Sequence, residues 1–267
     1  MNLKLNNGVN IPCIGFGTWK MNDYEVAVES VKSAILCGYR HIDTASIYGN
    51  EDAVGEAIKQ SHIARDKLFI TTKLWNTACS YEEAIEAFNT SLEKLKLDYV
   101  DLYLIHWPAP KDCRSFYQKR NIEIYRAMEK LYKDGKIKAI GVSNLEELSS
   151  QIEIPIMVNQ IEFHPYYYDE ETIAYCQKHN IVLEAYSPLG RGQVLNDPII
   201  KRIANKYNKT PAQICIRYAI PKSITIERIK SNHEVFDFQL TAKDIQEIKN
   251  LSHDHGKIGS HPDMADF

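Results

Sequence analysis

The feature that most limits the fold of this chain is a repeated alternation of apolar, β-rich runs with segments of helical period. The first run, IPCIGFGT at residues 11–18, precedes DYEVAVESVKSAILCG at residues 23–38, where apolar residues recur at helical spacing. Six more runs follow the same pattern: YRHIDT, KLFITTKLW, YVDLYLIHW, IKAIGVSN, IPIMVNQIEF and IVLEAYSPLG. Apolar strands joined by helical crossovers indicate a parallel sheet covered on both faces. Seven units favour closure into a (β/α)8 TIM barrel over an open sheet.

Length and composition set the number of domains. A chain of 267 residues that is 44% hydrophobic can bury one large core. We find no linker or low-complexity segment, so we expect a single barrel domain over residues 1–267. Ahead of the first unit, LKLNNGVNI carries an Asn-Gly pair between alternating residues, which is typical of a tight hairpin. We expect this hairpin to plug the bottom of the barrel.

The charge and cysteine patterns limit the partners and the compartment. The formal charge is -3, and basic residues alternate with acidic ones, which argues against nucleic acid as a partner. No run approaches the ~18 apolar residues that a membrane span needs. Six cysteines occur without a C-x-x-C pair, which fits reduced core residues better than disulfides or zinc ligands. We expect a cytoplasmic protein, a monomer or weak dimer, with no membrane partner.

Four polar residues fall at or just beyond the ends of consecutive predicted strands. Asp43 ends the second strand, Lys73 lies near the end of the third and His106 near the end of the fourth, while Tyr48 lies in the loop after the second. The C-terminal ends of barrel strands face the catalytic side, and neighbouring strands lie ~4.8 Å apart. The four side chains are therefore expected to converge. Taken singly, each has a structural explanation: a turn cap, a rim residue, an outward lysine and a hydrogen-bonded core histidine.

The chemistry of this group follows from acidity. A tyrosine of unperturbed pKa ~10 releases its proton more readily when an ammonium lies beside it. Lys73 could supply that charge, and Asp43 is the nearest carboxylate to pair with it once both are desolvated. His106 would orient a substrate oxygen or share the proton transfer. The group predicts a general acid poised above a carbonyl.

At this point the sequence resembles the aldo-keto reductase family, and within it the NADPH-dependent aldehyde and diketo-acid reductases of prokaryotes. The motifs that carry the resemblance are GFGTW, HIDTASIYGNE, TTKLWN, DLYLIHWP, GVSN, VNQIEFHP, AYSPLG and PKSITIERI. They occur in the family's order over nearly the whole chain. The resemblance implies a (β/α)8 barrel that binds NADPH and reduces a small-molecule carbonyl substrate. Asp43, Tyr48, Lys73 and His106 match the family's catalytic tetrad, with Tyr48 as the proton donor.

The resemblance also implies a set of cofactor contacts. Ser143, Asn144 and Gln160 match residues that bind the nicotinamide carboxamide, and Tyr186 matches the ring that stacks on the nicotinamide. Residues that follow the ribose and pyrophosphate are matched by Gly17, Thr18, Trp19, Ser187, Pro188, Leu189 and Gly190, with Asp43 also counted in the cofactor site. Lys222, Ser223, Arg228 and Asn232 match the site of the adenosine 2′-phosphate, where ammonium and guanidinium groups suit a dianion. NADPH is therefore favoured over NADH.

The substrate site is expected to be walled by aromatic rings. Trp19, Trp75 and Trp107 all fall at strand ends or just beyond them, beside Tyr48 and His106. Buried tryptophans belong to the core more often than to a pocket, but three on one catalytic face favour contact with substrate. The loop PAPKDCRSFYQK and the C-terminal GKIGSHPDMADF are expected to lie near the opening.

Three alternatives remain open at the level of sequence. A Rossmann dehydrogenase would use GFGTWK with Tyr132 and Lys136, but Lys20 replaces the third glycine and Asp134-Gly135 is typical of a helix end. A barrel metal hydrolase could draw its ligands from His41, Asp43, Lys73, His106 and His164, but it leaves Tyr48 and PKSITIER without roles. A regulatory subunit could keep the fold and bind NADPH without turnover.

Two segments are shorter than the family pattern, one after Asn144 and one between RYAI and PKS. About seven residues, including the eighth strand, are absent from the second, and a short link of ~10 to 13 Å cannot carry the chain from barrel bottom to top. The explanations are a disabling deletion, a helix recast as strand eight through ICIRYAI, or residues lost from the sequence because they are disordered in a cofactor-free crystal. We favour the last, which predicts chain breaks near Asn144/Leu145 and Ile220/Pro221.

Overall fold

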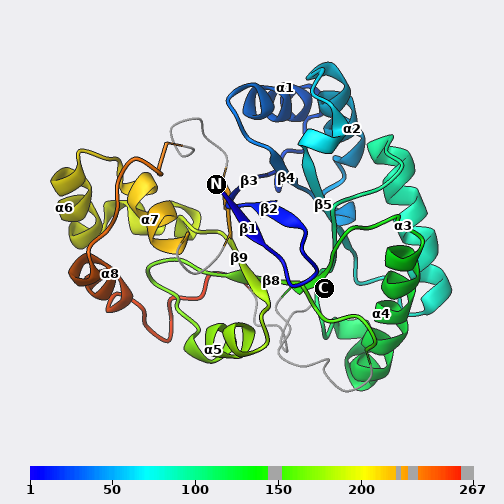
Figure 1. Cartoon of the computed structure of the whole chain (residues 1–267). Helices are drawn as coiled ribbons and strands as arrows, with labels where there is room; N and C mark the ends of the chain where they lie inside the picture. The colour runs from blue at the N-terminus through cyan, green and yellow to red at the C-terminus, as the bar shows by residue number, and fades with distance from the viewer. Residues whose placement is uncertain (144–151, 221–223, 228–233, 260–267) are drawn as a thin grey trace.

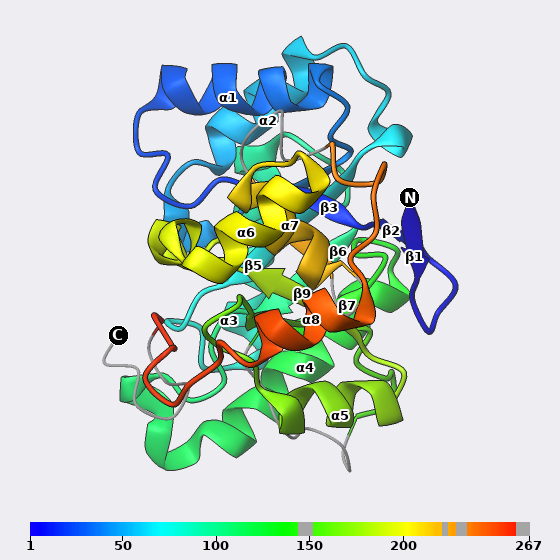
Figure 2. The same cartoon turned by 90° about the vertical axis from the view of Figure 1, so that its left-hand side faces the viewer.

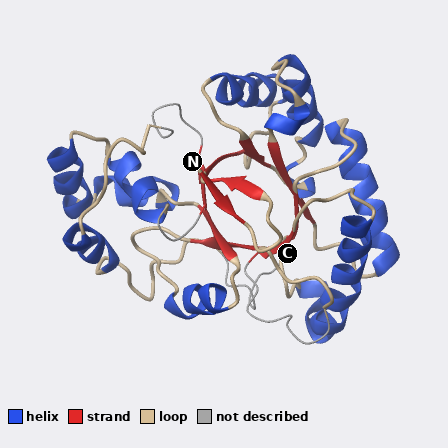
Figure 3. Cartoon of the chain, viewed as in Figure 1, coloured by secondary structure: helices blue, strands red, loops and turns tan. Residues whose placement is uncertain are grey.

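Eight parallel strands close into a ring in the part of the chain that the structure describes (Figures 1 and 3). This computed structural model describes residues 1–143, 152–220, 224–227 and 234–259. Around the ring the order is β10 (Ile224–Glu227), β3 (Ile14–Gly17), β4 (His41–Asp43), β5 (Phe69–Leu74), β6 (Leu102–Ile105), β7 (Ile140–Ser143), β8 (Val158–Glu162) and β9 (Val182–Tyr186). The predicted (β/α)8 barrel is confirmed.

The helices lie outside the strands, as Figure 3 shows in blue around the red ring. They are α1 (Tyr24–Leu36), α2 (Glu51–Gln60), α3 (Tyr81–Leu95), α4 (Tyr117–Lys133), α5 (Glu170–Lys178), α6 (Pro198–Tyr207), α7 (Pro211–Ala219) and α8 (Ala242–Lys249). Side-chain caps begin most of them. Asp23 accepts from the amide of Val26 at the start of α1, and Thr210 forms a capping box with Gln213 at the start of α7. Their buried faces pack on the sheet, so the local signals and the burial agree.

The eighth strand is a correction to the sequence prediction. We expected it to be missing, or to be recast from ICIRYAI, but that segment forms α7 and its residues are helical. The eighth position is taken instead by β10, which pairs in parallel with both β9 and β3. An open gap in the ring would leave two long unpaired edges, so the next β-branched run, ITIE, pairs in its place. The predicted chain break at Asn144/Leu145 lies outside the described residues, and so does Pro221 of the predicted break at Ile220/Pro221.

The N-terminal hairpin covers the bottom of the barrel. Strands β1 (Asn2–Lys4) and β2 (Asn10–Pro12) pair in antiparallel fashion, and Figure 1 shows them lying across the end of the ring. The Asn7 side chain donates to the carbonyl of Lys138, and Asn6 donates to the carbonyl of Ile156. Both carbonyls precede strands, which places the hairpin at their N-terminal ends. The predicted plug is confirmed, and the opposite end is left for the site.

Two of the six cysteines depart from the expectation of reduced core residues. Cys79 and Cys113 form a disulfide between residues 34 positions apart, whereas Cys13, Cys37, Cys176 and Cys215 are thiols. Sequence spacing did not indicate the pair, because the two loops that carry it meet only when β5 and β6 lie side by side. Within the described residues, we find no helix with the length and apolar character needed to cross a bilayer.

Candidate active site

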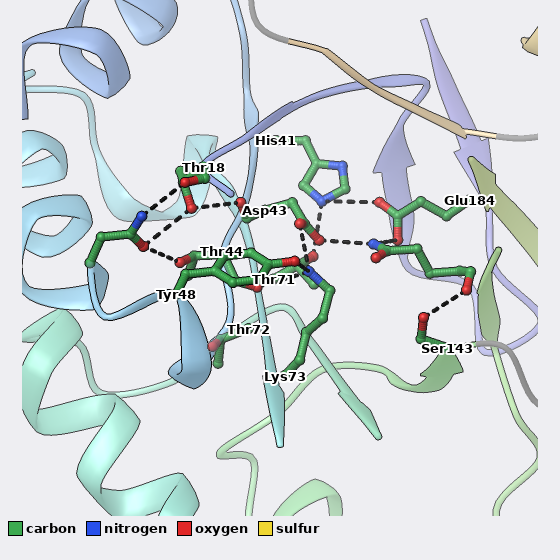
Figure 4. A network of polar contacts seen from close by, with 12 residues as sticks. Thr18, His41, Asp43, Thr44, Tyr48, Thr71, Thr72, Lys73, Ser143 and Glu184 are labelled. Atoms are coloured by element: carbon green, nitrogen blue, oxygen red, sulfur yellow. Dashed lines mark hydrogen bonds and ion pairs between the residues drawn. The ribbon is translucent and has the colours of Figure 1, made fainter. Parts of the chain in front are cut away.

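The centre of the site is an ion pair between Lys73 and Asp43 with Tyr48 beside it (Figure 4). Asp43 ends β4 and Lys73 lies on the adjacent β5, so both side chains enter the barrel near its C-terminal end. The Lys73 ammonium donates to Asp43 Oδ1 at 2.6 Å and to the Thr44 carbonyl at 3.0 Å. It also donates to the Tyr48 hydroxyl at 3.4 Å. The expected grouping of Asp43, Lys73 and Tyr48 is therefore present in the structure.

The local backbone explains how Tyr48 reaches this point. Tyr48 ends a short 3-10 helix, η1 (Ser46–Tyr48), which begins three residues after the end of β4. Ser46 ties this turn to β5 by donating to the Lys73 carbonyl. Gly49 then adopts a positive φ of 66°, a conformation that costs glycine little, and the chain turns into α2. The tyrosine ring is thus held over the end of β5, with the Lys73 ammonium 5.1 Å from its centroid.

The charges of this group are set by burial and by one another. Burial alone would lower the pKa of Lys73, but the nearby Asp43 carboxylate outweighs it and raises that pKa to about 12. Lys73 therefore stays an ammonium at any working pH. Burial, helped by Lys73, lowers the pKa of His106 well below its usual value, so the imidazole is neutral. A fixed cation and a neutral imidazole thus both lie beside Tyr48.

His106 follows β6 and lies among aromatic rings. The Tyr48 ring contacts it edge-on at 5.8 Å between centroids, and the Trp75 ring does so at 5.2 Å. The Trp107 ring is stacked at 6.5 Å. Two of the three predicted tryptophans therefore wall the space around His106. Trp19 lies beside the loop after β9, where the Arg191 guanidinium is 5.1 Å from its ring.

Gln160 joins the ion pair to a second buried carboxyl that the sequence analysis did not single out. Its Nε2 donates to Asp43 Oδ2 and to Glu184 Oε2, each at 2.9 Å. Ser143 lies opposite Gln160 across β7 and β8 and donates to its backbone carbonyl at 2.8 Å. Figure 4 shows Glu184 on one side of this network and Tyr48 on the other. With both of its N–H groups used, the Gln160 side chain has a carbonyl oxygen as its remaining polar group.

Glu184 and His41 lie side by side next to this network, and both are fully buried. Burial, together with the Asp43 charge, raises the pKa of Glu184 to about 8. Burial and the Lys73 charge lower the pKa of His41 to about 3. His41 Nε2 lies 3.5 Å from Glu184 Oε1 and 2.9 Å from the Thr71 hydroxyl. At neutral pH both groups are uncharged, so Lys73 and Asp43 form the charged pair of the cluster.

Asn50 was not identified as a site residue from the sequence, although this buried residue lies in the same motif as Tyr48. Its amide donates to the carbonyls of Thr18 and Met21, and its oxygen accepts from the hydroxyls of Thr18 and Thr44. Thr18 in turn follows Gly17, which pairs with Asp43 across β3 and β4. Its place directly before α2, where a polar residue is common, was the one sequence feature that could have pointed to Asn50. Asn50 holds the loops after β3 and β4 together, and so positions Thr18 and Tyr48.

The remaining predicted cofactor residues follow the end of β9. Tyr186 ends that strand opposite Glu162, and Ser187, Pro188, Leu189 and Gly190 lead into a 3-10 segment, η4 (Gly190–Asn196). Ser187 has a φ of +52°, a left-handed conformation that is unfavourable for serine and is concentrated at functional loops. Asn144, Lys222, Ser223, Arg228 and Asn232 lie outside the described residues.

The C-terminal segment reaches the same rim, as expected for its first residues. Glu162 ends β8, and its carboxylate accepts from the backbone amides of Ile258 and Gly259 at 2.6 and 2.7 Å. His164 lies 2.9 Å from the same carboxylate. Burial would raise the pKa of Glu162, but these hydrogen bonds outweigh it and lower that pKa. A buried carboxylate thus holds residues 258–259 over the end of β8.

The structure bears on two of the alternatives. Tyr132 lies at the end of α4, and its hydroxyl accepts from Asn7 of the bottom hairpin. The Tyr132 and Lys136 pattern is therefore at the wrong end of the barrel to act with the ion pair. Among the residues that the structure describes, no three His, Cys, Asp or Glu side chains are placed to hold a metal. The described residues therefore offer no set of ligands for the metal-hydrolase hypothesis.

Comparisons with known proteins agree with this geometry. The sequence model of the Aldo/keto reductase family matches residues 13–253. The chain is 48% identical to "Glyoxal reductase" of Bacillus subtilis (strain 168), over 99% of this chain and 97% of that protein. It is 43% identical to "Methylglyoxal reductase DkgA" of Yersinia pestis, over 98% of this chain and 96% of that protein.

Solved structures give the same result. MGS-M4, an aldo-keto reductase from a Medee basin deep-sea metagenome library, superposes with a TM-score of 0.92 at 44% identity, over 99% of this chain and 100% of that chain. A Bombyx mori aldo-keto reductase in complex with NADP gives a TM-score of 0.86 at 37% identity, over 94% of this chain and 92% of that chain. The alignment with the Bacillus protein spans 277 positions against 267 residues here, so at least ten have no counterpart in this chain.

A family match over nearly the whole length, a shared barrel and an ion-paired lysine beside a tyrosine at its C-terminal end lead to one conclusion. The chain belongs to the Aldo/keto reductase family.

Proposed function

We propose that this protein reduces the carbonyl group of a small aldehyde or ketone with NADPH, and that Tyr48 donates the proton to the carbonyl oxygen. The observation that carries the proposal is the Tyr48 hydroxyl 3.4 Å from an ammonium that Asp43 holds at 2.6 Å. The names of two relatives, a glyoxal reductase and a methylglyoxal reductase, support small 2-oxoaldehydes as the substrate class. The site would act on compounds that fit between Tyr48, His106 and the two tryptophans beside them.

The described residues fit a nicotinamide cofactor. Gln160 uses both N–H groups on carboxyl oxygens, which turns it into an acceptor for a primary amide such as the carboxamide of the ring. Tyr186 ends β9, two strands away from β7, which Ser143 ends. An aromatic ring at this position would suit stacking on the planar nicotinamide. When bound, NADPH supplies the hydride. The preference for the 2′-phosphate rests on the resemblance of Lys222, Ser223, Arg228 and Asn232 to the family's residues.

The protein's own residues would handle the proton and the oxygen. The Lys73 charge favours ionisation of the Tyr48 phenol, so the proton leaves it more readily as negative charge develops on the substrate oxygen. Neutral His106 can donate one N–H to that oxygen and so fix its position. Trp75 and Trp107 lie against the imidazole and would shield it from solvent when substrate is bound. Each role needs the charge state that burial imposes on Lys73 and His106.

Removing the Tyr48 hydroxyl tests the proposal. Tyr48→Phe should lower kcat for methylglyoxal by about a hundredfold or more, because general acid catalysis contributes on that order. NADPH affinity, measured by fluorescence titration, should change less than about threefold, because the phenol acts only at the proton-transfer step. Tyr24→Phe is the matched control, since Tyr24 is exposed on α1. A Tyr48→Phe enzyme with full activity would contradict the mechanism.

A parallel measurement separates the enzyme from the regulatory alternative. Wild-type protein that binds NADPH but consumes none at 340 nm, across a panel of aldehydes and ketones, would identify a binding protein of the same fold. One observation supports the regulatory alternative. Residues 224–227 form the eighth strand, so the residues matched to the 2′-phosphate site are divided between the two sides of that strand in the sequence.

A further inference from the structure

The disulfide between Cys79 and Cys113 joins the two loops that carry the aromatic wall of the site. Residues 75–80 connect β5 to α3, and residues 106–116 connect β6 to α4. Trp75 begins the first loop, and His106 with Trp107 begins the second. Cys79 lies at the far end of the first loop and Cys113 in the 3-10 segment of the second, η3 (Lys111–Phe116). The bond therefore links these loops at their ends remote from His106.

A buried arginine ties the same two loops without a covalent bond. The Arg120 guanidinium, 1% exposed on α4, donates to the carbonyls of Ala78 and Asn76 in the first loop. It also donates to the Trp107 carbonyl in the second loop, and the neighbouring Asn121 donates to Pro108. The loops near the substrate side thus stay together whatever the state of the cysteines. The disulfide adds a second tether nearer their ends.

The two sulfurs differ in access to small reagents. Cys79 is half-buried, whereas Cys113 is 1% exposed. The Cys79 amide donates to Glu83 at 2.6 Å, and Ser80 caps α3, so Cys79 sits on a fixed helix start. Of the cysteines outside the disulfide, Cys13, Cys176 and Cys215 are buried and Cys37 is half-buried. Burial also raises the pKa of the Cys13 and Cys176 thiols, which makes them poor nucleophiles.

We propose that Cys79 and Cys113 form a reversible thiol–disulfide site that reacts with low-molecular-weight disulfides and sets the order of the loops around the substrate opening. The Cys79 thiolate attacks one sulfur of the small disulfide and releases one small thiol. The Cys113 thiolate then attacks Cys79 in the mixed disulfide and releases the second. Two electrons pass from the cysteine pair to the small disulfide, and the two protein thiol protons end on the two small thiols.

The functional consequence rests on the proposed carbonyl reduction. With the bond closed, the loops carrying Trp75 and Trp107 have less freedom to lose when substrate binds, which favours a lower KM. With the bond open, the Arg120 hydrogen bonds still tie them together. The oxidised form is therefore expected to have a KM for small carbonyl compounds about three- to tenfold lower than the reduced form. The KM for NADPH should not change, because none of the residues matched to the cofactor site falls within residues 75–80 or 106–116.

The first test follows the sulfurs and does not depend on activity. The whole protein is equilibrated with mixtures of oxidised and reduced glutathione, then alkylated and digested for mass spectrometry. The expected result is a linked pair of peptides containing Cys79 and Cys113, formed and lost reversibly, while Cys37 remains a thiol. Cys79 and Cys113 alkylated at every ratio would overturn the proposal. A stable glutathione adduct on Cys79 without the linked peptides would also overturn it.

The second test follows the loops and the kinetics in parallel. Hydrogen exchange in residues 75–80 and 106–116 should quicken on reduction of the wild type, and should be insensitive to reductant in Cys79→Ser. Cys113→Ala provides a second open form should the first variant fold poorly, and Cys37→Ser is the control that keeps the redox response. Unchanged exchange, or an unchanged KM in an active enzyme, would overturn the loop coupling. If wild-type protein reduces no carbonyl, the proposed function fails while the exchange data still decide the coupling.

Discussion

The buried charge of Lys73 affects the protonation states of the groups around it. It is 0% exposed, yet it stays an ammonium because the Asp43 carboxylate lies 2.6 Å away. Two buried carboxyls near one buried cation cannot both ionise cheaply. Glu184, the one farther from Lys73 in the network, therefore retains its proton at neutral pH. The residue that holds the proton is set by distance from the cation rather than by residue type.

Glu184→Gln should make stability less dependent on pH. The folded protein raises the pKa of Glu184 from 4.5 to about 8, so between those values it binds more protons than the unfolded chain, and stability falls as pH rises. Glutamine removes this cost while its oxygen still accepts from Gln160. The gain in free energy of unfolding should be about 1–3 kcal/mol larger at pH 8 than at pH 5, measured by urea unfolding. A gain independent of pH would contradict this, and exposed Glu82→Gln is the control.

Lys222→Ala and Arg228→Ala test the choice of cofactor at the residues that resemble the 2′-phosphate site. Each substitution deletes one charge-assisted hydrogen bond to a dianion, which is worth about 1.5–3 kcal/mol. NADPH should therefore bind roughly tenfold or more weakly, while NADH, which lacks that phosphate, should bind as before. Isothermal titration with both nucleotides measures this, with the exposed Lys201→Ala as control. Equal losses for the two nucleotides would count against the assignment.

At the scale of elements, the site depends on loops that are held by side chains from neighbouring units. Arg120 on α4 holds the loops after β5 and β6, and Asn50 holds those after β3 and β4. Glu162 at the end of β8 holds the C-terminal segment by two backbone amides. Each anchor satisfies loop groups that would otherwise lack partners, because loops have no ladder of their own. These anchors tie the rim of the barrel to the helices and strands beside it.

Glu162→Gln should loosen the C-terminal segment. The carboxylate accepts from both Ile258 and Gly259, whereas an amide offers one acceptor oxygen and turns an N–H group toward the other donor. We expect a loss of about 1–2 kcal/mol in the free energy of unfolding and faster hydrogen exchange in residues 256–259. Glu171→Gln, exposed on α5, is the control. Unchanged exchange in this segment would show that other contacts hold it.

At the scale of the molecule, one end of the barrel is closed by the hairpin and the other end carries the candidate active site. Figure 2 shows the β1–β2 hairpin at one edge of the view and the red loop after α8 at the opposite edge. Leu5 and Ile11 of the hairpin region are buried against residues such as Phe69 and Leu102, at the starts of their strands. The ion pair lies at the other ends of the strands. Changes at the bottom should therefore affect stability and leave catalysis alone.

Asn7→Ala tests this separation. Asn7 donates to the Lys138 carbonyl at 2.9 Å and accepts from the Val9 amide at 3.1 Å, so its loss leaves both of these backbone groups without this partner. Thermal or urea unfolding should show a loss of about 1–2 kcal/mol. At a temperature where the variant is folded, kcat/KM should stay within about twofold of wild type. Lys4→Ala, exposed on the same hairpin, should change stability by less than ~0.5 kcal/mol.

The local sequence pattern was sufficient to predict the barrel, the hairpin plug and the grouping of Asp43, Tyr48 and Lys73. Apolar runs of strand length alternate with helical segments, and a parallel arrangement sends every strand end to one face. Asp43, Tyr48 and Lys73 could therefore be grouped from their places at strand ends. The sequence determined these features because each depends on neighbours along the chain, and on one geometric rule that applies to every βα unit.

Contacts between distant segments were decided only by the tertiary structure. The eighth strand is residues 224–227 because β9 and β3 both need a partner at that place, not because ITIE is unusual. Gln160 meets Asp43 across 117 positions, Arg120 meets Ala78 across 42, and the two bonded cysteines lie 34 apart. The charge states of Glu184, His41 and His106 follow from desolvation. Desolvation depends on what the whole fold packs around a side chain, and no local pattern contains that information.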